Sequence, residues 1–234
     1  LVMAGVLCYS LQLYGDFSGG MDVIMGASEC FGISLDANFK RPYFAQSISD
    51  FWHRWHITLG TWMKDYVFYP FSLSKGMNKF GKFCKKHFGK HVSRVLPVCI
   101  ANLLVFFLVG VWHGPAWKFI VYGLYNGIII AASNLFSPFY GEMARKLHIP
   151  VESRSWMVVR ILRTFLLVNV SWYFDMAVSL GAALTMMKNT VTGFSLAALW
   201  DGSLLRLGLD LKDYAALALS CTVLLAVSLL QENH

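Results

Sequence analysis

The feature that most constrains this chain is a set of four apolar stretches, each close to the length of a membrane-crossing helix. The clearest covers residues 95–112, roughly 27 Å of helix at 1.5 Å per residue, and the others cover 117–136, 156–174 and 213–230. Hydrophobic residues make up 56% of the chain and charged residues only 14%. Soluble domains are less apolar and more highly charged. We therefore expect an all-α membrane protein with several spans, in the cell membrane.

Polar residues and glycines interrupt the apolar sequence near its start. Residues 1–13 form a partial span that we expect to end at the glycines and Asp16 of residues 14–20. Residues 21–35 contain two carboxylates, which favours a broken or interfacial helix. Because the chain begins inside an apolar run, we expect a fragment that lacks an N-terminal part. No feature indicates a domain boundary, so residues 1–234 are predicted to form a single membrane domain.

Positive charge is concentrated in one segment. Residues 75–94 hold seven basic side chains and no acidic one, which equals the net charge of +7 for the whole chain. A short basic connection between apolar segments is expected on the cytoplasmic side of the membrane. One role for this segment is to set the orientation of the chain in the membrane and to contact anionic lipid. The other is to dock an acidic soluble partner through Lys82, Lys85 and Lys86.

Several kinds of chemistry lack support in this sequence. The five cysteines are scattered without a C-x-x-C pair, so they predict neither a disulfide framework nor a zinc site. No other ligand pattern predicts a bound metal. No phosphate-binding loop occurs, and nothing suggests binding to nucleic acid.

Tryptophan and histidine occur together twice, each time beside apolar sequence. The two clusters are F-W-H-R-W-H-I-T-L at residues 51–59 and G-V-W-H-G-P-A-W at residues 110–117. Histidine titrates nearest to neutral pH, and a histidine at membrane depth is a functional candidate. His56 and His113 therefore indicate acid–base chemistry at a membrane, while the alternative is a pair of interfacial histidines in an aromatic belt.

The local sequence around each histidine adds detail. A helix capped by Ser47 or Ser49 would place Trp52 and His56 on one face, because they are four residues apart. His113 is followed by Gly-Pro, which ends a helix and can open a cavity beside it. Carboxylates near apolar surface, such as Asp16, suit helix caps or ion pairs.

The motifs, taken together and in order, resemble the membrane-bound O-acyltransferase (MBOAT) superfamily. The similarity is to its bacterial branch, which D-alanylates teichoic acids or O-acetylates alginate, and it runs from the start of the chain to about residue 175. It rests on Y-G-D-F-S-G-G-M-D (14–22), N-F-K-R-P-Y (38–43), D-F-W-H-R-W-H-I-T-L (50–59), W-M-K-D-Y (62–66) and G-V-W-H-G-P-A-W (110–117).

The resemblance implies a helical bundle around a funnel or tunnel, with broken and interfacial helices. It implies that His113 is the principal catalytic residue and His56 the second. Relatives often carry a histidine where this chain has Asn126, which can only hydrogen-bond. The residues expected to line the tunnel or orient substrate are Trp52, Trp55, Trp112, Trp117, Asn126 and Asp16.

The reaction implied is acyl transfer from a thioester to a hydroxyl, with no bound cofactor. The donor could be an acyl group on a phosphopantetheine carrier protein. The acceptor would be a hydroxyl of teichoic acid or an exopolysaccharide, reached through an accessory extracytoplasmic protein. Two alternatives stay open: a transporter or channel with a histidine relay, and an inactive scaffold of an acyltransfer complex. The sequence does not separate acetyl from D-alanyl donors.

Overall fold

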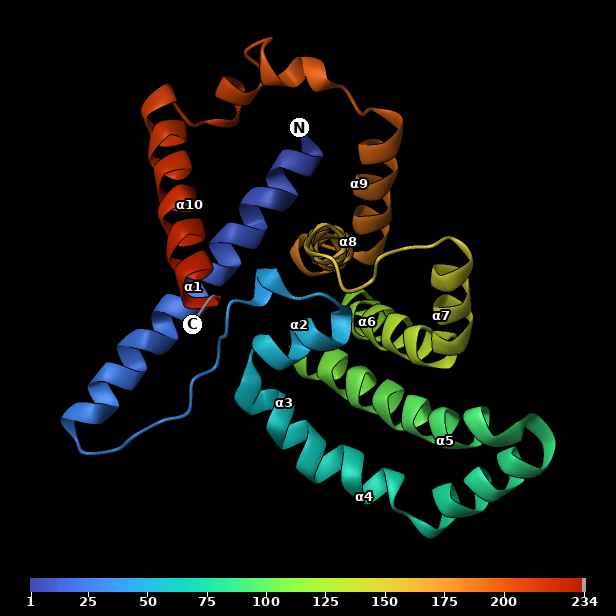
Figure 1. Cartoon of the computed structure of the whole chain (residues 1–234). Helices are drawn as coiled ribbons and strands as arrows, with labels where there is room; N and C mark the ends of the chain where they lie inside the picture. Colours follow the sequence, from blue (N-terminus) through green and yellow to red (C-terminus); the bar gives the residue numbers. More distant parts are fainter. Residues whose placement is uncertain (233–234) are drawn as a thin grey trace. The chain divides into compact units, whose positions relative to one another are not determined.

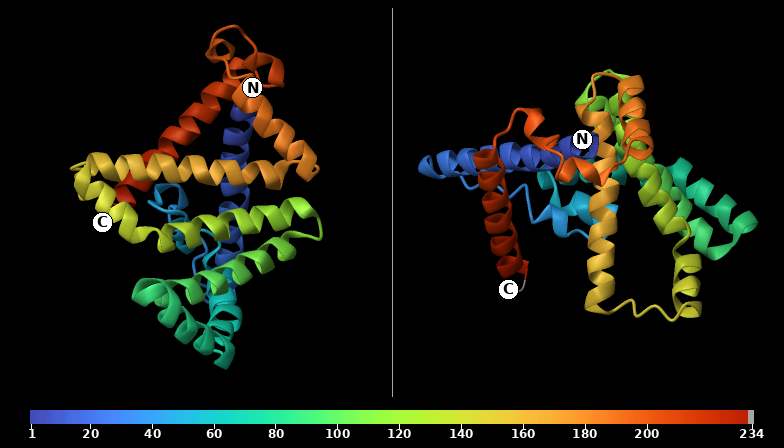
Figure 2. Two further views of the ribbon diagram at one scale, coloured as in Figure 1. Left: turned by 90° about the vertical axis from the view of Figure 1, so that its right-hand side faces the viewer. Right: turned by 90° about the horizontal axis from the view of Figure 1, so that it is seen from above.

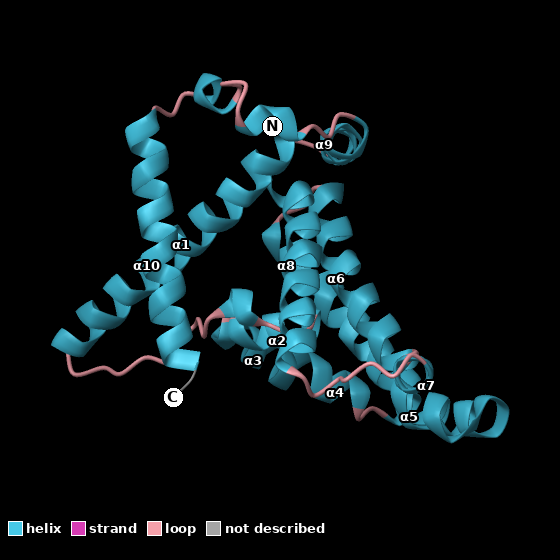
Figure 3. Cartoon of the chain, turned by 45° about the horizontal axis from the view of Figure 1, so that its top comes forward, coloured by secondary structure: helices cyan, strands magenta, loops and turns pink. Residues whose placement is uncertain are grey.

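The computed structural model describes residues 1–232, and these residues form helices joined by loops (Figures 1 and 3). No strand occurs within them; one antiparallel bridge joins Phe39 and Trp55. The expectation of an all-α membrane protein is therefore confirmed. The chain divides into two compact units, Val6–Leu184 and a second formed by Leu1–Gly5 with the chain from Thr185 onward. The single domain over residues 1–234 stays a prediction.

The first helix is longer than the sequence predicts. α1 covers Val2–Cys30 and passes through the glycine-containing motif without a break. A glycine inside a helix costs only about 1 kcal/mol, which tertiary contacts can offset. Ser10 supplies such a contact, because its hydroxyl donates to the Asn169 side chain on α8 at 2.7 Å. The predicted helix end at residues 14–20 is therefore wrong.

The next two helices are separated at the first tryptophan–histidine motif. After the short η1 (Pro42–Phe44), α2 covers Ile48–Arg54 and α3 covers Ile57–Met63. Ser47 caps α2 as predicted, accepting from the Asp50 amide at 3.0 Å. The backbone between the helices instead pairs with residues 38–40, since the Ile57 amide donates to the Asn38 carbonyl. Trp52 and His56 therefore do not share a helix face, and that prediction is wrong.

The basic segment is helical instead of forming a connecting loop. A π-helical stretch (η2, Lys64–Phe68) and α4 (Tyr69–Ser72) lead to α5, which covers Lys75–His113. Lysine is a good helix former, and the Ser74 hydroxyl caps the start by accepting from the Met77 amide. A single break occurs at Gly89, where φ is +81°. The short connection expected at residues 75–94 is therefore part of a helix, and the expectation is wrong in conformation.

α6 (Trp117–Leu135) returns alongside the apolar part of α5 (Figure 2). Glycines allow the two backbones to approach closely. A Cβ atom on Gly110 would lie 2.5 Å from the Phe119 carbonyl oxygen, and one on Gly123 would collide with the Phe106 carbonyl oxygen. This close contact fixes the end of α5, where His113 lies, against the start of α6.

α7 (Ser137–Lys146) follows α6 after a bend of 61°, and α8 (Arg154–Met176) packs on α6. α8 buries Trp172, Tyr173 and Phe174 near its C-terminal end. The remaining elements are α9 (Leu180–Thr192), η3 (Leu196–Leu199), η4 (Leu204–Leu207) and α10 (Leu211–Glu232).

The helices long and apolar enough to cross a membrane match the predicted apolar stretches. Among residues 1–232 they are α5, α8 and the Leu211–Gln231 part of α10, with the bent pair α6 and α7 as a fourth if it counts as one span. This assignment rests on length and composition, and it supports a membrane protein.

Candidate active site

His113 is the last residue of α5, and Gly114 ends the helix beyond it. The φ of Gly114 is +151°, and a side chain there would also meet the Phe119 ring. Only 26% of the His113 side chain is exposed. The Gly-Pro break thus places a half-buried imidazole at a helix end, as the sequence predicts.

A carboxylate faces His113 from α8. The Asp175 Oδ1 atom lies 3.9 Å from His113 Nδ1, a separation that suits charge attraction but is too long for a direct hydrogen bond. The other carboxylate oxygen, Oδ2, accepts from the Tyr9 hydroxyl of α1 at 2.6 Å. Lys118 Nζ donates to the backbone carbonyls of Asp175 and Ala177 at 2.8 and 2.6 Å. Asp175 is therefore held on both its side chain and its backbone.

Aromatic rings enclose the His113 imidazole on several sides. The ring centroids of Trp112, Tyr122 and Phe119 lie 5.0, 5.1 and 5.9 Å from that of His113. Such rings exclude water from the sides of the imidazole that they cover. A transfer from a thioester, which water can hydrolyse, would benefit from this exclusion.

His56 lies at the junction of α2 and α3 in a left-handed conformation, with φ of +49°. Its Nδ1 atom is 3.1 Å from the Asn38 side-chain oxygen, which also accepts from the Thr58 hydroxyl at 2.7 Å. Because that oxygen already accepts from a hydroxyl and from the Thr58 amide, His56 Nδ1 is assigned as the donor. Neutral His56 then has an unprotonated Nε2 that can accept a proton or a hydrogen bond.

Burial lowers the pKa of His56, and positive charge on His113 lowers it further. Burial disfavours the charged imidazolium, and a second cation nearby repels it. Neutral His56 is therefore the dominant form at neutral pH.

The two histidines flank one tryptophan. The Trp112 ring centroid lies 5.8 Å from that of His56 and 5.0 Å from that of His113. The Trp112 side chain is itself exposed. The structure thus brings His56, Trp112 and His113 together, although they come from separate sequence motifs.

The remaining predicted residues divide into buried and exposed groups. Trp55 is buried and stacks on Phe51 within an aromatic cluster. Trp52 donates its indole N–H to the Asn126 oxygen at 3.3 Å, and Asn126 donates to the Tyr122 carbonyl at 2.9 Å. Asn126 therefore acts as a hydrogen-bonding residue behind Tyr122.

Trp117 and Asp16 are exposed, and in the described part of the chain they make no ring contact or hydrogen bond with either histidine. Asp16 accepts from Gln12 at 3.4 Å, as a local pair on α1 would. Their assignment to a tunnel stays a prediction.

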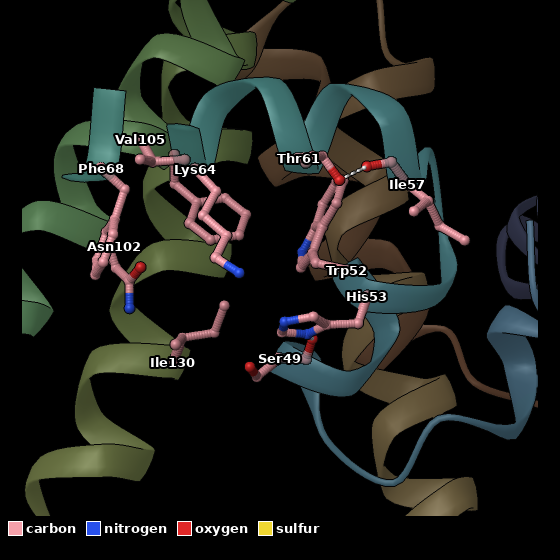
Figure 4. A pocket seen from close by; sticks show the side chains of 12 residues that line it. Ser49, Trp52, His53, Ile57, Thr61, Lys64, Phe68, Asn102, Val105 and Ile130 are labelled. Atoms are coloured by element: carbon pink, nitrogen blue, oxygen red, sulfur yellow. Dashed lines mark hydrogen bonds between the residues drawn. The ribbon is translucent and has the colours of Figure 1, made fainter. Parts of the chain in front are cut away.

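A pocket of about 330 Å³ lies next to Trp52 (Figure 4). The Lys64 amine and the His53 ring point into it, and His53 is held by a 2.6 Å hydrogen bond from Nδ1 to the Ser49 carbonyl. Apolar side chains such as Val105 and Ile130 form much of the remaining wall. The pocket can accommodate a flexible, partly polar chain.

Sequence reasoning missed Asp175, Tyr9 and Asn38. Asp175 is the one carboxylate at the end of the apolar stretch 156–174, and this position was its only signal. Asn38 is the first residue of the N-F-K-R-P-Y motif, but the motif did not indicate that it contacts His56. Tyr9 gave no signal, because its role depends on contacts with distant segments. Within the described residues no group of three His, Cys, Asp or Glu side chains could hold a metal ion; metal-free chemistry stays a prediction.

Comparison of the sequence with known proteins shows which protein family the chain belongs to. The sequence model described as "MBOAT, membrane-bound O-acyltransferase family" matches residues 1–172. The chain therefore belongs to the membrane-bound O-acyltransferase family. Both histidines fall inside the match, whereas Asp175 lies just beyond it.

Curated relatives from three bacteria share about a third of the aligned residues. The chain is 36% identical over 79% of its length to a peptidoglycan O-acetyltransferase from Helicobacter pylori, and covers 30% of that protein. It is 35% identical over 78% to a probable alginate O-acetylase from Azotobacter vinelandii, covering 31% of it. It is 34% identical over 70% to a teichoic acid D-alanyltransferase from Bacillus subtilis, covering 38% of it. The chain thus spans about a third of the length of these relatives.

Proposed function

We propose that this chain carries the reaction centre of a membrane O-acyltransferase that moves an acyl group from a thioester to a hydroxyl of a cell-envelope polymer. The observation that carries the proposal is the placement of His113 opposite Asp175 and across Trp112 from His56. Membership of the acyltransferase family and the names of the relatives support the same reaction.

In the proposed reaction, His113 is the general base. Its Nδ1 faces the Asp175 carboxylate, which leaves Nε2 to remove the proton from the acceptor hydroxyl as its oxygen attacks the thioester carbonyl. The tetrahedral intermediate then collapses, the carbon–sulfur bond breaks, and the protonated His113 returns the proton to the leaving thiolate. The products are an ester and a free thiol, so no further reactant is needed.

Asp175 would act on the reaction through His113 and is therefore a positioning residue. A carboxylate opposite Nδ1 favours the tautomer with a proton on that atom and stabilises the imidazolium that forms. Tyr9 and Lys118 restrain Asp175 in the position required for this role.

His56 would take the second role. Its unprotonated Nε2 can accept a hydrogen bond from the incoming hydroxyl, while Asn38 fixes the orientation of the ring. General acid–base and orienting effects of this kind contribute about 10²-fold or more to the rate.

The pocket beside Trp52 is proposed as part of the path of the donor. Its Lys64 amine would attract an anionic group, such as the phosphodiester of a phosphopantetheine arm, and its apolar wall would accommodate the chain. The exposed Lys82, Lys85 and Lys86 would attract the acidic carrier protein, with the basic segment on the cytoplasmic side.

The acceptor is proposed to be a hydroxylated polymer of the cell envelope, with peptidoglycan, alginate and teichoic acid as the candidates from the relatives' names. An accessory extracytoplasmic protein would present it. The two donor classes, acetyl and D-alanyl, both fit the same hydroxyl chemistry.

The test is reconstitution of the full-length protein in proteoliposomes with acetyl and D-alanyl thioesters, each offered with the three acceptor polymers. Release of free thiol and formation of polymer ester would be measured together. We expect both products in equal amounts from one donor class. If every donor yields neither product while the protein is correctly inserted, the proposal of catalysis is wrong and the scaffold alternative gains support.

A further inference from the structure

A second cavity, of about 640 Å³, lies away from both histidines, between the start of α2, the C-terminal part of α6, α7 and α8. Its wall is largely apolar, with Ile129, Ile130, Trp156 and Leu167 among the lining residues. Ser47 and Ser133 add hydroxyls, and Arg163 adds a guanidinium. No carboxylate of the described chain lines it. The cavity therefore combines a cation with a long apolar wall.

A second arginine occupies the same face of α8. Trp156, Arg160, Arg163 and Leu167 follow one another at intervals of four, three and four residues, which places them in one stripe along the helix. The Arg160 Nε atom is buried and has no hydrogen-bond partner. Arg163 donates from Nη2 to the Gln46 carbonyl at 2.9 Å, which leaves other N–H groups available.

An anion would stabilise the two arginines in this position. They lie six and nine residues into a helix that is long and apolar enough to span a membrane, about 9 to 14 Å from its start. A buried guanidinium donor without an acceptor costs free energy, and two neighbouring cations repel each other. A phosphate group accepts from arginine in a bidentate way and relieves both costs.

The setting favours a phosphate on a lipid over a free one. Candidate membrane spans form two walls of the cavity, and apolar residues provide room for an acyl chain. The cavity also lies at the end of the bundle where the basic segment is found, because His91 donates from Nε2 to the carbonyl of Leu135 at the end of α6. Basic pockets between spanning helices on the cytoplasmic side bind anionic lipid headgroups.

We infer that this cavity binds one anionic phospholipid, with its phosphate at Arg163, an acyl chain along Ile129 and Trp156, and Arg160 on the same stripe of α8 adding positive charge from just outside the lining. The hydroxyls of Ser47 and Ser133 are available to the polar headgroup. The site does not involve His56, His113 or Asp175, although Ser49 and Ile130 also line the pocket beside Trp52.

The test is to titrate the purified full-length protein in detergent with phosphatidylglycerol or with phosphatidylcholine of matched chains, counting bound lipids by native mass spectrometry. Phosphatidylglycerol should be retained as one tight lipid. Arg163→Gln should weaken it about fivefold, and the double change with Arg160→Gln should weaken it further. Ala144→Phe fills the cavity from α7 without changing charge, so it should also displace the lipid.

Two controls make the inference falsifiable. Arg154→Gln removes an exposed cation from the start of α8 outside the cavity and should leave binding unchanged. The site would be overturned, in favour of diffuse surface attraction, if Arg154→Gln weakened lipid binding as much as Arg163→Gln does. It would also be overturned if Ala144→Phe, with an unchanged melting temperature, still retained the lipid. Displacement by soluble glycerol phosphate at similar concentration would overturn the lipid and indicate a free anion.

Discussion

The two tryptophan–histidine motifs produce two different environments for histidine. His113 ends a long apolar helix and faces the Asp175 carboxylate at 3.9 Å. His56 sits in a left-handed junction between two short helices and is held at 3.1 Å by the neutral Asn38 side chain. Both imidazole rings contact Trp112, so they lie in the same part of the structure. Their environments differ because their hydrogen-bonding and charged partners differ.

The partner decides what each imidazole can do. A carboxylate stabilises a histidine that becomes positively charged during reaction, which suits a base that removes a proton. A neutral amide oxygen fixes one tautomer without strongly favouring the charged form, which suits a ring that stays neutral and orients a hydroxyl. Sequence motifs that look alike are thus expected to have unequal roles.

The largest effect should come from His113→Ala. We expect loss of acyl transfer by about 10⁴-fold, because the base is removed while binding is retained. The measurement is ester formation per inserted protein, with insertion checked by protease accessibility. Transfer at a rate close to the unmodified protein would remove His113 from the mechanism and abolish the distinction between the two histidines.

His56→Asn should reduce the rate by about 10²-fold. Asparagine tolerates the left-handed conformation better than alanine, so this variant removes the ring with little backbone strain. His56→Ala serves as the comparison, and an added loss of melting temperature in the alanine variant would report the strain. A rate loss as large as that of His113→Ala would contradict the secondary role of His56.

Asp175→Asn should lower kcat about tenfold and leave KM unchanged, because the carboxylate orients His113 and does not touch substrate. Tyr9→Phe, which releases one restraint on Asp175, should have a smaller effect in the same direction. Asp175→Glu should recover part of the loss. A change confined to KM, or no recovery in the glutamate variant, would place Asp175 in a structural role instead.

Replacing Lys82, Lys85 and Lys86 with glutamate should reduce transfer from a carrier protein severalfold. The reduction should be smaller at high salt, because salt screens exposed charges. Transfer from a small thioester should be unchanged. Equal loss with both donors would indicate altered topology or misfolding, and no loss with either would leave the segment as a topology signal.

The smallest effect concerns pH. Because burial lowers the pKa of His56, the unfolded chain takes up this proton at a higher pH than the folded one. The contribution of neutral His56 to the free energy of unfolding is therefore fully present above the ordinary histidine pKa of about 6.5. This contribution is lost as the pH falls below that value. We expect the melting temperature of the unmodified protein to fall when the pH is lowered from neutral to about 5. The fall should be smaller, by a few degrees, in His56→Asn. Equal acid sensitivity would contradict a buried, neutral His56.

Much of the helical fold was predictable because apolar length is a local property. The stretches 117–136 and 156–174 became α6 and α8 with bounds shifted by at most two residues. The serine cap before α2 and the helix end at Gly114 were predictable for the same reason, since both depend on a few neighbouring residues. The motif resemblance also identified His56 and His113 as the residues to examine.

Two of the errors occurred where distant contacts overrode local preference. Glycines predicted the end of a helix in α1, but contacts such as Ser10 with Asn169 are available only after α8 has packed. Four-residue spacing placed Trp52 and His56 on one face, but pairing of the backbone with residues 38–40 broke the helix between them. The basic segment was expected to be a short connection, but lysine favours a helix, which runs through Gly76 and Gly81 to the break at Gly89.

By itself the sequence determined that this is a helical membrane protein with two histidine motifs and one basic segment, because hydrophobic length, helix-ending residues and net charge are read locally along the chain. Only the tertiary structure decided which groups face those histidines. Asp175 and Tyr9 are separated by 166 positions in sequence, yet they share a 2.6 Å hydrogen bond beside His113. Such a contact depends on how α1, α5 and α8 pack, and packing is a property of the whole bundle and not of any one segment.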